Sequence, residues 1–123
     1  MESPMNFPPT HAIMPRFGSL VELLHHRAVR QADQRAYVFI NEAGAELAEL
    51  TFRQLDDCSR SLAKRLAELA APGDRALLIF APGLDFLVAY FACLYAGIIG
   101  VPVVPPRRKA SWSATAIFWP IWR

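Results

Sequence analysis

Two adjacent pairs of titratable residues are the first candidates for chemistry in this sequence. His25 and His26 could bind a metal or carry a proton, and Asp56 and Asp57 could form a carboxylate pair for acid–base work. Both pairs fall in segments with helical patterning, and adjacent residues on a helix point in different directions. We therefore expect neither pair to act as a unit, and we expect one histidine to be half-exposed and the other solvated.

The turn Pro82–Asp85 is a further candidate, because it ends an apolar run and opens a helical one. Phosphates bind at such places. The turn lacks the glycines and lysine of a phosphate-binding loop, and the Asp85 carboxylate would repel a phosphate and occupy the free amides. No GxSxG, HExxH or CxxC motif occurs in the chain. The residues therefore predict a structural turn, and no catalytic, cofactor-binding or metal site.

Length, charge and cysteine content narrow the class of protein. The 123 residues suit one domain or less. A formal net charge of +2 is too small to indicate a nucleic-acid partner. Residues 1–16 have three early prolines and no apolar segment of a secretory signal, so they predict a flexible lead-in. Cys58 and Cys93 stand among apolar residues and are expected to be small buried side chains in a reducing cytoplasm.

The first half of the chain predicts a helix, a β-hairpin and a second helix. Ser19 and Glu22 form a capping-box pattern, which predicts a helix ending near Gln31. Residues 37–40 and 45–50 predict two strands joined by a turn. A second capping box at Thr51–Gln54 begins a long helix to about residue 70. The expected apolar face of this helix comprises Leu55, Cys58, Leu62, Leu66 and Leu69.

Between Arg75 and Arg107, Asp85 is the only charged residue. Residues 76–80 have the size of a buried strand, and Pro82 with Gly83 marks a turn. Asp85 is expected to be the N-cap of a helix over residues 86–96. Gly97 stands where a left-handed glycine ends a helix, and residues 98–104 (IIGVPVV) are mostly β-branched and hold Pro102. This order predicts a strand–helix–strand crossover, and hence a parallel sheet.

A membrane span is the alternative interpretation of the same stretch. Residues 86–104 carry no charge, and a transmembrane helix needs about 20 such residues. The basic run 107–109 would then face the cytoplasm; otherwise it is a solvated loop. The helix expected over residues 86–96 is apolar on every face, so it must be buried in a large protein or in lipid. A domain of this length buries only about two-thirds of its unfolded surface, which indicates part of something larger.

Several strings in this order resemble the N-terminal segment of fatty acyl-AMP ligases, in the superfamily of adenylate-forming enzymes. They are Ser19–Ala28 (SLVELLHHRA), Arg35–Ile40 (RAYVFI), Leu50–Leu66 (LTFRQLDDCSRSLAKRL) and Gly73–Arg108 (GDRALLIFAPGLDFLVAYFACLYAGIIGVPVVPPRR). The resemblance covers residues 17–109. It implies an α/β fold that is the partial N-terminal region of an adenylate-forming enzyme, with helix, β-hairpin, helix and then a parallel βαβ unit.

The resemblance also implies a reaction for the intact family. These enzymes are AMP-dependent synthetases that use ATP and Mg²⁺ to convert a fatty acid to acyl-AMP and pyrophosphate. The fatty acyl-AMP branch passes the acyl group to an acyl carrier protein or polyketide synthase. The phosphate loop, the adenine-binding segment, the ribose-binding Asp and the late Lys of the family have no counterpart here, so no catalytic residue is carried over. The resemblance therefore implies a cytoplasmic piece that is inactive alone.

Residues 110–123 depart from the family pattern abruptly. All three tryptophans, Trp112, Trp119 and Trp122, fall in this tail, which has no acidic residue. One hypothesis is a frameshifted reading frame, and another is a tail that anchors at a membrane or partner surface, since Trp favours interfaces. The expected organisation is therefore a lead-in (1–16), the N-terminal part of a synthetase domain (17–109) and a divergent tail. A non-catalytic interaction fragment stays open as an alternative function.

Overall fold

A computed structural model of the chain describes residues 16–105 and, as backbone, residues 117–121. The elements are α1 (Leu20–Arg30), β1 (Arg35–Ile40), β2 (Glu46–Thr51), α2 (Phe52–Leu69), β3 (Arg75–Ile79), α3 (Leu84–Ala96), β4 (Ile99–Val103) and β5 (Ile117–Ile121). The predicted α/β order of helix, hairpin, helix and βαβ unit is confirmed. The basic run 107–109 and, apart from Arg16, the lead-in lie outside the described residues.

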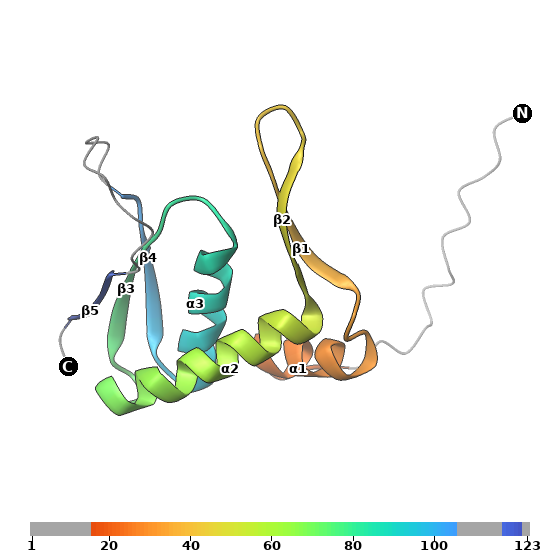
Figure 1. Ribbon diagram of the computed structural model, residues 1–123. Helices are drawn as coiled ribbons and strands as arrows, with labels where there is room; N and C mark the ends of the chain where they lie inside the picture. The colour runs from red at the N-terminus through yellow and green to blue at the C-terminus, as the bar shows by residue number, and fades with distance from the viewer. Residues whose placement is uncertain (1–15, 106–116, 122–123) are drawn as a thin grey trace, which may run out of the picture.

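Two small sheets stand side by side, with α1 and α2 along the base of the molecule (Figure 1). Strands β1 and β2 pair antiparallel as a hairpin. The other sheet has the order β4-β3-β5, with β4 parallel and β5 antiparallel to β3. Helix α2 runs along the base of the molecule from the hairpin to this second sheet, and α3 lies against one face of the sheet (Figure 1). The parallel β3–α3–β4 unit is thus the crossover that the sequence predicts.

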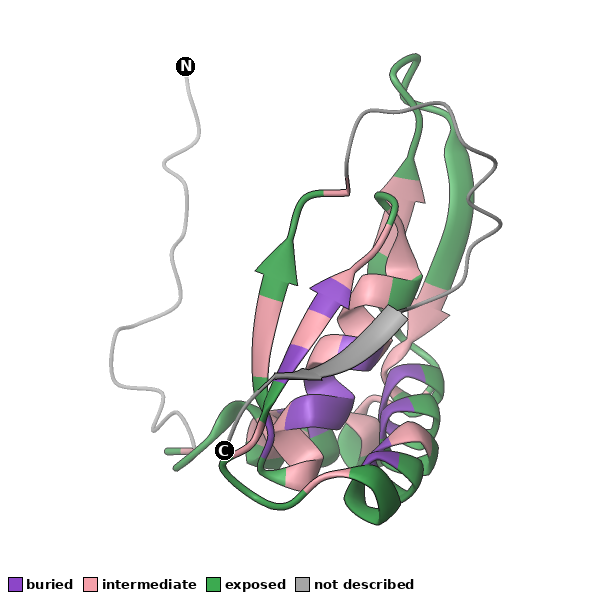
Figure 2. Ribbon diagram, turned by 90° about the vertical axis from the view of Figure 1, so that its left-hand side faces the viewer, coloured by how far each residue is buried: buried purple, intermediate pink, exposed green. Residues whose placement is uncertain are grey.

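The core lies where α3 meets the sheet on one side and α2 on the other. The buried cluster there joins Ala63 and Leu66 of α2, Leu78 of β3, and Ala92 and Cys93 of α3. Small residues on α2 and α3 let the two helices pack closely. Figure 2 shows the buried positions of α2 confined to its inward side. A second cluster, around Leu24, Leu55 and Phe91, fixes α1 to the same pair of helices.

The buried face of α2 differs from the predicted one. Cys58 is exposed and Leu69 is 78% exposed, whereas Asp56 and Ser59 are buried. The predicted face was made of the most hydrophobic side chains. In the structure, the side of α2 that packs on α3 carries small and polar residues beside Leu55. The expectation of two buried cysteines is therefore wrong for Cys58 and confirmed for Cys93.

The helix ends follow local capping signals, with one correction. The Ser19 hydroxyl accepts from the Glu22 amide, and Thr51 and Gln54 form a complete capping box. Helix α3 begins at Leu84 with Gly83 as its N-cap, so Asp85 stands inside the first turn rather than capping it. There its carboxylate still lies at the positive end of the helix dipole. Gly97 ends α3 with φ 71°, as predicted.

The membrane-span alternative for residues 86–104 is wrong. Gly97 divides that stretch into the end of α3 and the strand β4. Within the described ranges, no helix has both the length and the apolar content to cross a bilayer.

Strand β5 is a feature that the sequence did not predict. It pairs with β3 along the edge opposite β4, with Leu77 facing Trp119 and Ala76 facing Pro120 in the register. Pro102 occupies the other outer strand, β4, opposite Leu78. Proline lacks an N–H donor and is tolerated in edge strands. Each outer strand of this sheet therefore contains a proline.

We predict that Gly97→Ala destabilises the fold. A Cβ at Gly97 would force an L residue into the left-handed region and would lie 3.4 Å from Pro72 Cβ. We expect the free energy of unfolding to fall by about 1–2 kcal/mol, measured by urea denaturation followed by circular dichroism. Gly18→Ala is the matched control, since Gly18 is not among the positive-φ glycines and a Cβ there would lie 3.4 Å from Glu22 Oε2, at the end of a flexible side chain. Equal losses in the two variants would contradict the prediction.

Candidate functional site

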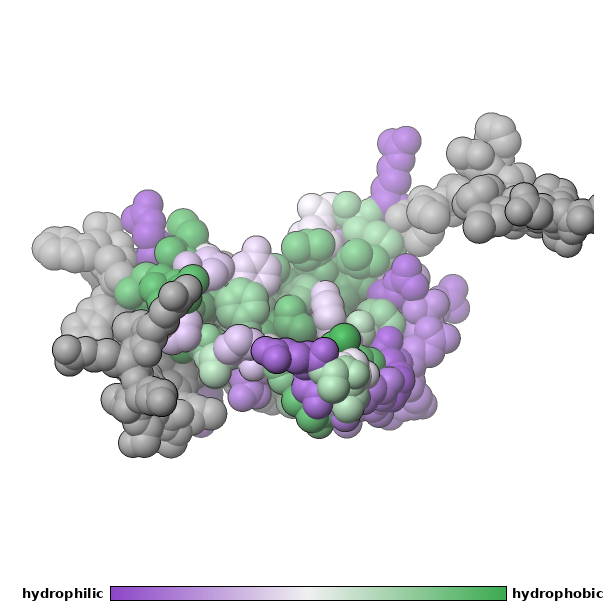
Figure 3. Space-filling model, turned by 90° about the horizontal axis from the view of Figure 1, so that it is seen from above, coloured by the Kyte–Doolittle hydropathy of each residue, from purple (hydrophilic) through white to green (hydrophobic). Residues whose placement is uncertain are grey.

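An apolar hollow opens at the carboxyl ends of the parallel strands β3 and β4. In open α/β sheets, ligands bind outside the carboxyl ends of the strands. The hollow has a volume of about 510 Å³ and lies between the β3–α3 turn and the segment after β4. Its walls carry only apolar side chains and one glycine: Leu78, Phe80, Ala81, Pro82, Gly83, Phe86, Pro102, Val103, Val104 and Pro105. Figure 3 looks down on this end and shows apolar residues across its middle.

The walls of this hollow offer mainly apolar and aromatic contacts. Phe80, Phe86 and Tyr90 form a row of aromatic rings with centroids 6.0–6.2 Å apart, and this row supports one wall. The described wall residues include no cation for a triphosphate and no oxygen-bearing side chain for Mg²⁺. They therefore do not fit the ATP and Mg²⁺ that the resemblance implies. Nor does the described part of the chain hold any cluster of three or more metal-ligating side chains.

The turn Pro82–Asp85, considered as a phosphate site, lies at the rim of the hollow. Helix α3 begins there without a side-chain cap. The acidic Asp85 in the first turn disfavours an anion, so the structural interpretation of this turn is retained.

The structure separates both pairs of titratable residues. His25 is exposed, whereas His26 is half-buried with its ring 5.0 Å from that of Phe17. Asp56 is 3% exposed, while the neighbouring Asp57 is exposed on the outer side of α2. Neither pair forms a joint site, as the helical geometry predicts.

Asp56 is the centre of a polar cluster that joins the three helices. The Tyr95 hydroxyl of α3 donates a hydrogen bond to Asp56 Oδ1. Asp56 Oδ2 lies 3.4 Å from His25 Nδ1 of α1 and 3.7 Å from Arg60 Nη1, one turn further along α2. The Arg60 guanidinium also lies 6.0 Å from the centre of the Tyr95 ring. A buried carboxylate needs such partners, because an unpaired buried charge is strongly destabilising.

Burial and the bond to Asp56 act together on Tyr95. Desolvation, followed by the hydrogen bond to the carboxylate, raises the pKa of the Tyr95 hydroxyl well above its usual range. Tyr95 therefore remains a protonated donor throughout the physiological range. The same hydroxyl lies 3.5 Å from the Val21 carbonyl oxygen of α1. The cluster thus holds α1, α2 and α3 together, and Arg60 and Tyr95 also line a shallow open hollow between α2 and α3.

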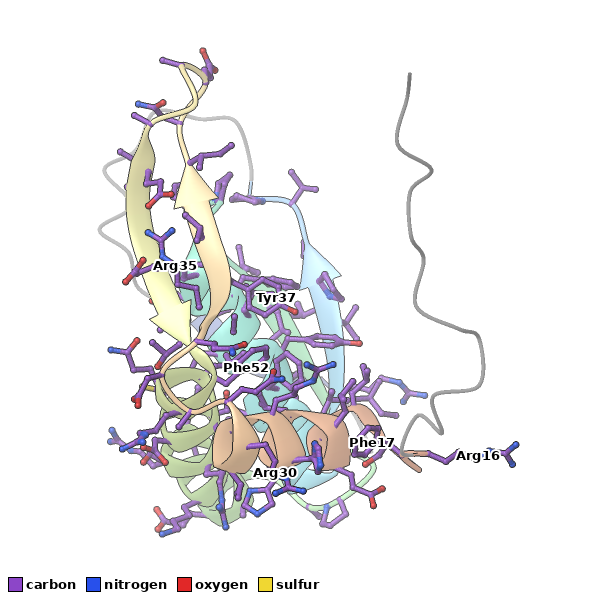
Figure 4. All side chains as sticks on the ribbon, turned by 90° about the vertical axis from the view of Figure 1, so that its right-hand side faces the viewer. Arg16, Phe17, Arg30, Arg35, Tyr37 and Phe52 are labelled. Atoms are coloured by element: carbon purple, nitrogen blue, oxygen red, sulfur yellow. The ribbon has the colours of Figure 1, made fainter. Side chains whose placement is uncertain are left out.

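A second groove of about 400 Å³ lies between α1 and the hairpin. Tyr37 of β1 and Phe52 of α2 stand in its walls (Figure 4), and Arg27 of α1 also lines it. Arg27 donates to Gln31 Oε1 at 2.7 Å. Arg35 is not among the wall residues and binds Glu46 and Glu49 of β2. This groove separates the hairpin from α1 and contains no paired catalytic groups.

The Asp56 cluster was not among the sites predicted from the sequence. The predicted apolar face of α2 contained no polar residue, and Asp56 was considered only as half of a pair with Asp57. The overlooked signal is the spacing of Asp56, Ser59 and Ala63, which share one helix face with Leu55. A polar residue within such a row predicts a buried polar contact.

Comparison with known proteins gives the family. The sequence model described as AMP-binding enzyme matches residues 24–117. The medium-chain-fatty-acid–[acyl-carrier-protein] ligase JamA of Moorena producens is 37% identical over 92 residues, which cover 75% of this chain and 16% of that protein.

Two solved structures agree with this chain in fold and sequence. The crystal structure of the fatty acid AMP ligase from Legionella pneumophila is 42% identical with a TM-score of 0.67, over 74% of this chain and 16% of that one. A fatty acyl-adenylate ligase from L. pneumophila, in complex with acyl adenylate and pyrophosphate, is 44% identical with a TM-score of 0.66. The matched part covers 72% of this chain and 15% of that one.

The βαβ unit, its apolar hollow and these matches define an adenylate-forming class of fold. The chain belongs to the AMP-binding enzyme family. Within that family it matches the N-terminal portion of fatty acyl-AMP ligases, which confirms the resemblance seen in the sequence. It spans 16% of the length of the first two proteins compared.

We predict that Asp56→Asn weakens the packing of the three helices. The substitution removes the charge with which Arg60 pairs and to which the Tyr95 hydroxyl donates. Hydrogen bonds to charged groups contribute about 1.5–3 kcal/mol to stability. We expect the free energy of unfolding to fall by about that amount in urea denaturation. Asp57→Asn, at the exposed neighbour, should stay within about 0.5 kcal/mol of the wild type. Equal effects of both changes would show that the cluster does not stabilise the fold.

Proposed function

We propose that this chain is the N-terminal framework of a fatty acid adenylating ligase. The intact enzyme would join a fatty acid and ATP to give acyl-AMP and pyrophosphate. The observation that carries the proposal is the match to the Legionella fatty acid AMP ligase, at 42% identity and a TM-score of 0.67. The related structure that binds acyl adenylate and pyrophosphate supports the same reaction.

The contribution of this chain to such an enzyme would be structural. The apolar hollow at the carboxyl ends of β3 and β4 would supply one wall of a ligand site. The described residues around it offer no donor that stabilises charge on a transferring phosphorus, and such donors carry the largest part of this kind of catalysis. The chain alone would therefore not adenylate a fatty acid.

The partners and location of the intact enzyme are part of the same proposal. A carrier protein as acyl acceptor is supported by the relative from Moorena producens, which is a ligase for an acyl carrier protein. A cytoplasmic location is supported by Cys58 and Cys93, which are both free thiols.

We predict no adenylation by the purified chain. The ATP–pyrophosphate exchange assay, run with medium- and long-chain fatty acids, should give no exchange above a no-enzyme control. The intact Legionella ligase serves as the positive control. Clear turnover by the purified chain would refute the framework role, because its described residues would then have to supply the missing electrostatic stabilisation.

The division of the chain is proposed as a lead-in (1–16), the ligase portion (17–109) and a tail (110–123) translated out of frame. The concentration of Trp112, Trp119 and Trp122 in the tail supports a change of composition there.

We predict that the DNA following the codon for Lys109 encodes a Ser/Thr/Gly-rich phosphate loop in another frame. Reading that DNA in all three frames is the test, and its absence from every frame would remove the hypothesis.

A further inference from the structure

The groove between α1 and the β1–β2 hairpin combines apolar walls with a single cation. Its volume of about 400 Å³ lies within the range of small-molecule sites, which is about 300–1,000 Å³. Seven of its nine lining residues have purely hydrocarbon side chains, and the other two are Arg27 and Tyr37. The Arg27 guanidinium and the Tyr37 hydroxyl are therefore the only hydrogen-bonding side-chain groups in this lining.

Part of the groove wall is already fixed by the core. Leu24 of α1, Leu55 of α2 and Phe91 of α3 are 4%, 0% and 9% exposed and form one buried cluster. A ligand would meet side chains that need no reordering, which lowers the cost of binding. Two other lining residues, Leu20 and Tyr37, are 53% and 41% exposed. Apolar surface therefore remains for a ligand to cover.

Arg27 interrupts the apolar stripe with which α1 lines the groove. Residues 20, 23, 24 and 27 follow the spacing of one helix face; the first three are leucines and the fourth is arginine. Arg27 Nη1 donates to Gln31 Oε1 at 2.7 Å, which uses one of the five N–H donors of a guanidinium. Among the described residues, no ion pair includes Arg27. No acidic residue lines the groove, so nothing in its wall would repel an anion.

We propose that this groove binds a single-chain anionic amphiphile, with its alkyl chain along the leucine stripe and its carboxylate on Arg27. Charge complementarity selects this occupant, because a guanidinium matches a carboxylate through two parallel N–H···O bonds. The leucine and aromatic walls match an alkyl chain. The groove shares no lining residue with the hollow at the ends of β3 and β4. Binding here is therefore independent of the adenylation reaction proposed above.

An NMR titration of the full chain with sodium octanoate tests the site and locates it. We expect saturable shifts of the backbone amides of Ala36 and Phe52, while those of Phe80 and Val103 stay unchanged. Across hexanoate, octanoate and decanoate, binding should tighten about fourfold for each added CH₂ until the groove is full, because each buried CH₂ contributes a similar increment. Shifts confined to Phe80 and Val103 would place the ligand in the other hollow and overturn the inference.

The variant Arg27→Gln separates the contact with the carboxylate from folding. The wild-type chain should bind octanoate at least about tenfold more tightly than octan-1-ol, because hydrogen bonds to charged groups are stronger than neutral ones. In Arg27→Gln this preference should disappear, while the affinity for octan-1-ol and the circular dichroism spectrum stay those of the wild type. Arg30→Gln is the matched control, since Arg30 is exposed on α1 and does not line the groove. It should keep the preference.

Three further results would overturn the inference. The first is the absence of saturable octanoate binding by the wild-type chain. The second is an equal change in the preference for octanoate in Arg27→Gln and Arg30→Gln, which would show a response to overall charge. The third is binding to vesicles of phosphatidylglycerol without binding to free octanoate, which would indicate a membrane surface as the partner instead.

Discussion

The burial of α3 governs the arrangement of the other elements. This helix has no polar face: its side chains are aliphatic, aromatic or small from Phe86 to Ala96. Such a helix is stable in water only when it is enclosed. The sheet covers one side of it, α2 covers another, and α1 closes part of the remainder through Leu24 and Phe91. The parallel crossover and the close contact between α2 and α3 both follow from this requirement.

The polar groups around Asp56 fix how the helices that enclose α3 are oriented. Asp56 is 3% exposed and lies where α1, α2 and α3 meet. Its bonds to Tyr95, His25 and Arg60 fix how the helices meet. The cluster holds the helices behind the sheet, while the apolar hollow stands at the far ends of β3 and β4. The polar cluster and the apolar hollow thus occupy separate parts of the fold.

Local signals carried most of the secondary structure that could be predicted. Ser19, Thr51 and Gly97 cap helices through contacts with residues close by in the sequence. The sequence alone therefore indicated these helix ends. Contacts between distant segments were not accessible in the same way. The exposure of Cys58 and the burial of Asp56 depend on which face of α2 packs on α3. The strand β5, which pairs with β3, has no alternating pattern of apolar and polar residues that would predict it. The apolar hollow was missed because it requires the ends of β3 and β4 to lie together.

The prolines in the two outer strands limit how this protein can aggregate. Fibril growth by strand addition needs an edge that offers an unbroken row of backbone donors and acceptors. Pro102 in β4 and Pro120 in β5 each interrupt that row. Ordered cross-β stacking through these edges is therefore disfavoured. Association of molecules through this sheet would therefore use its exposed apolar face rather than strand addition at its edges.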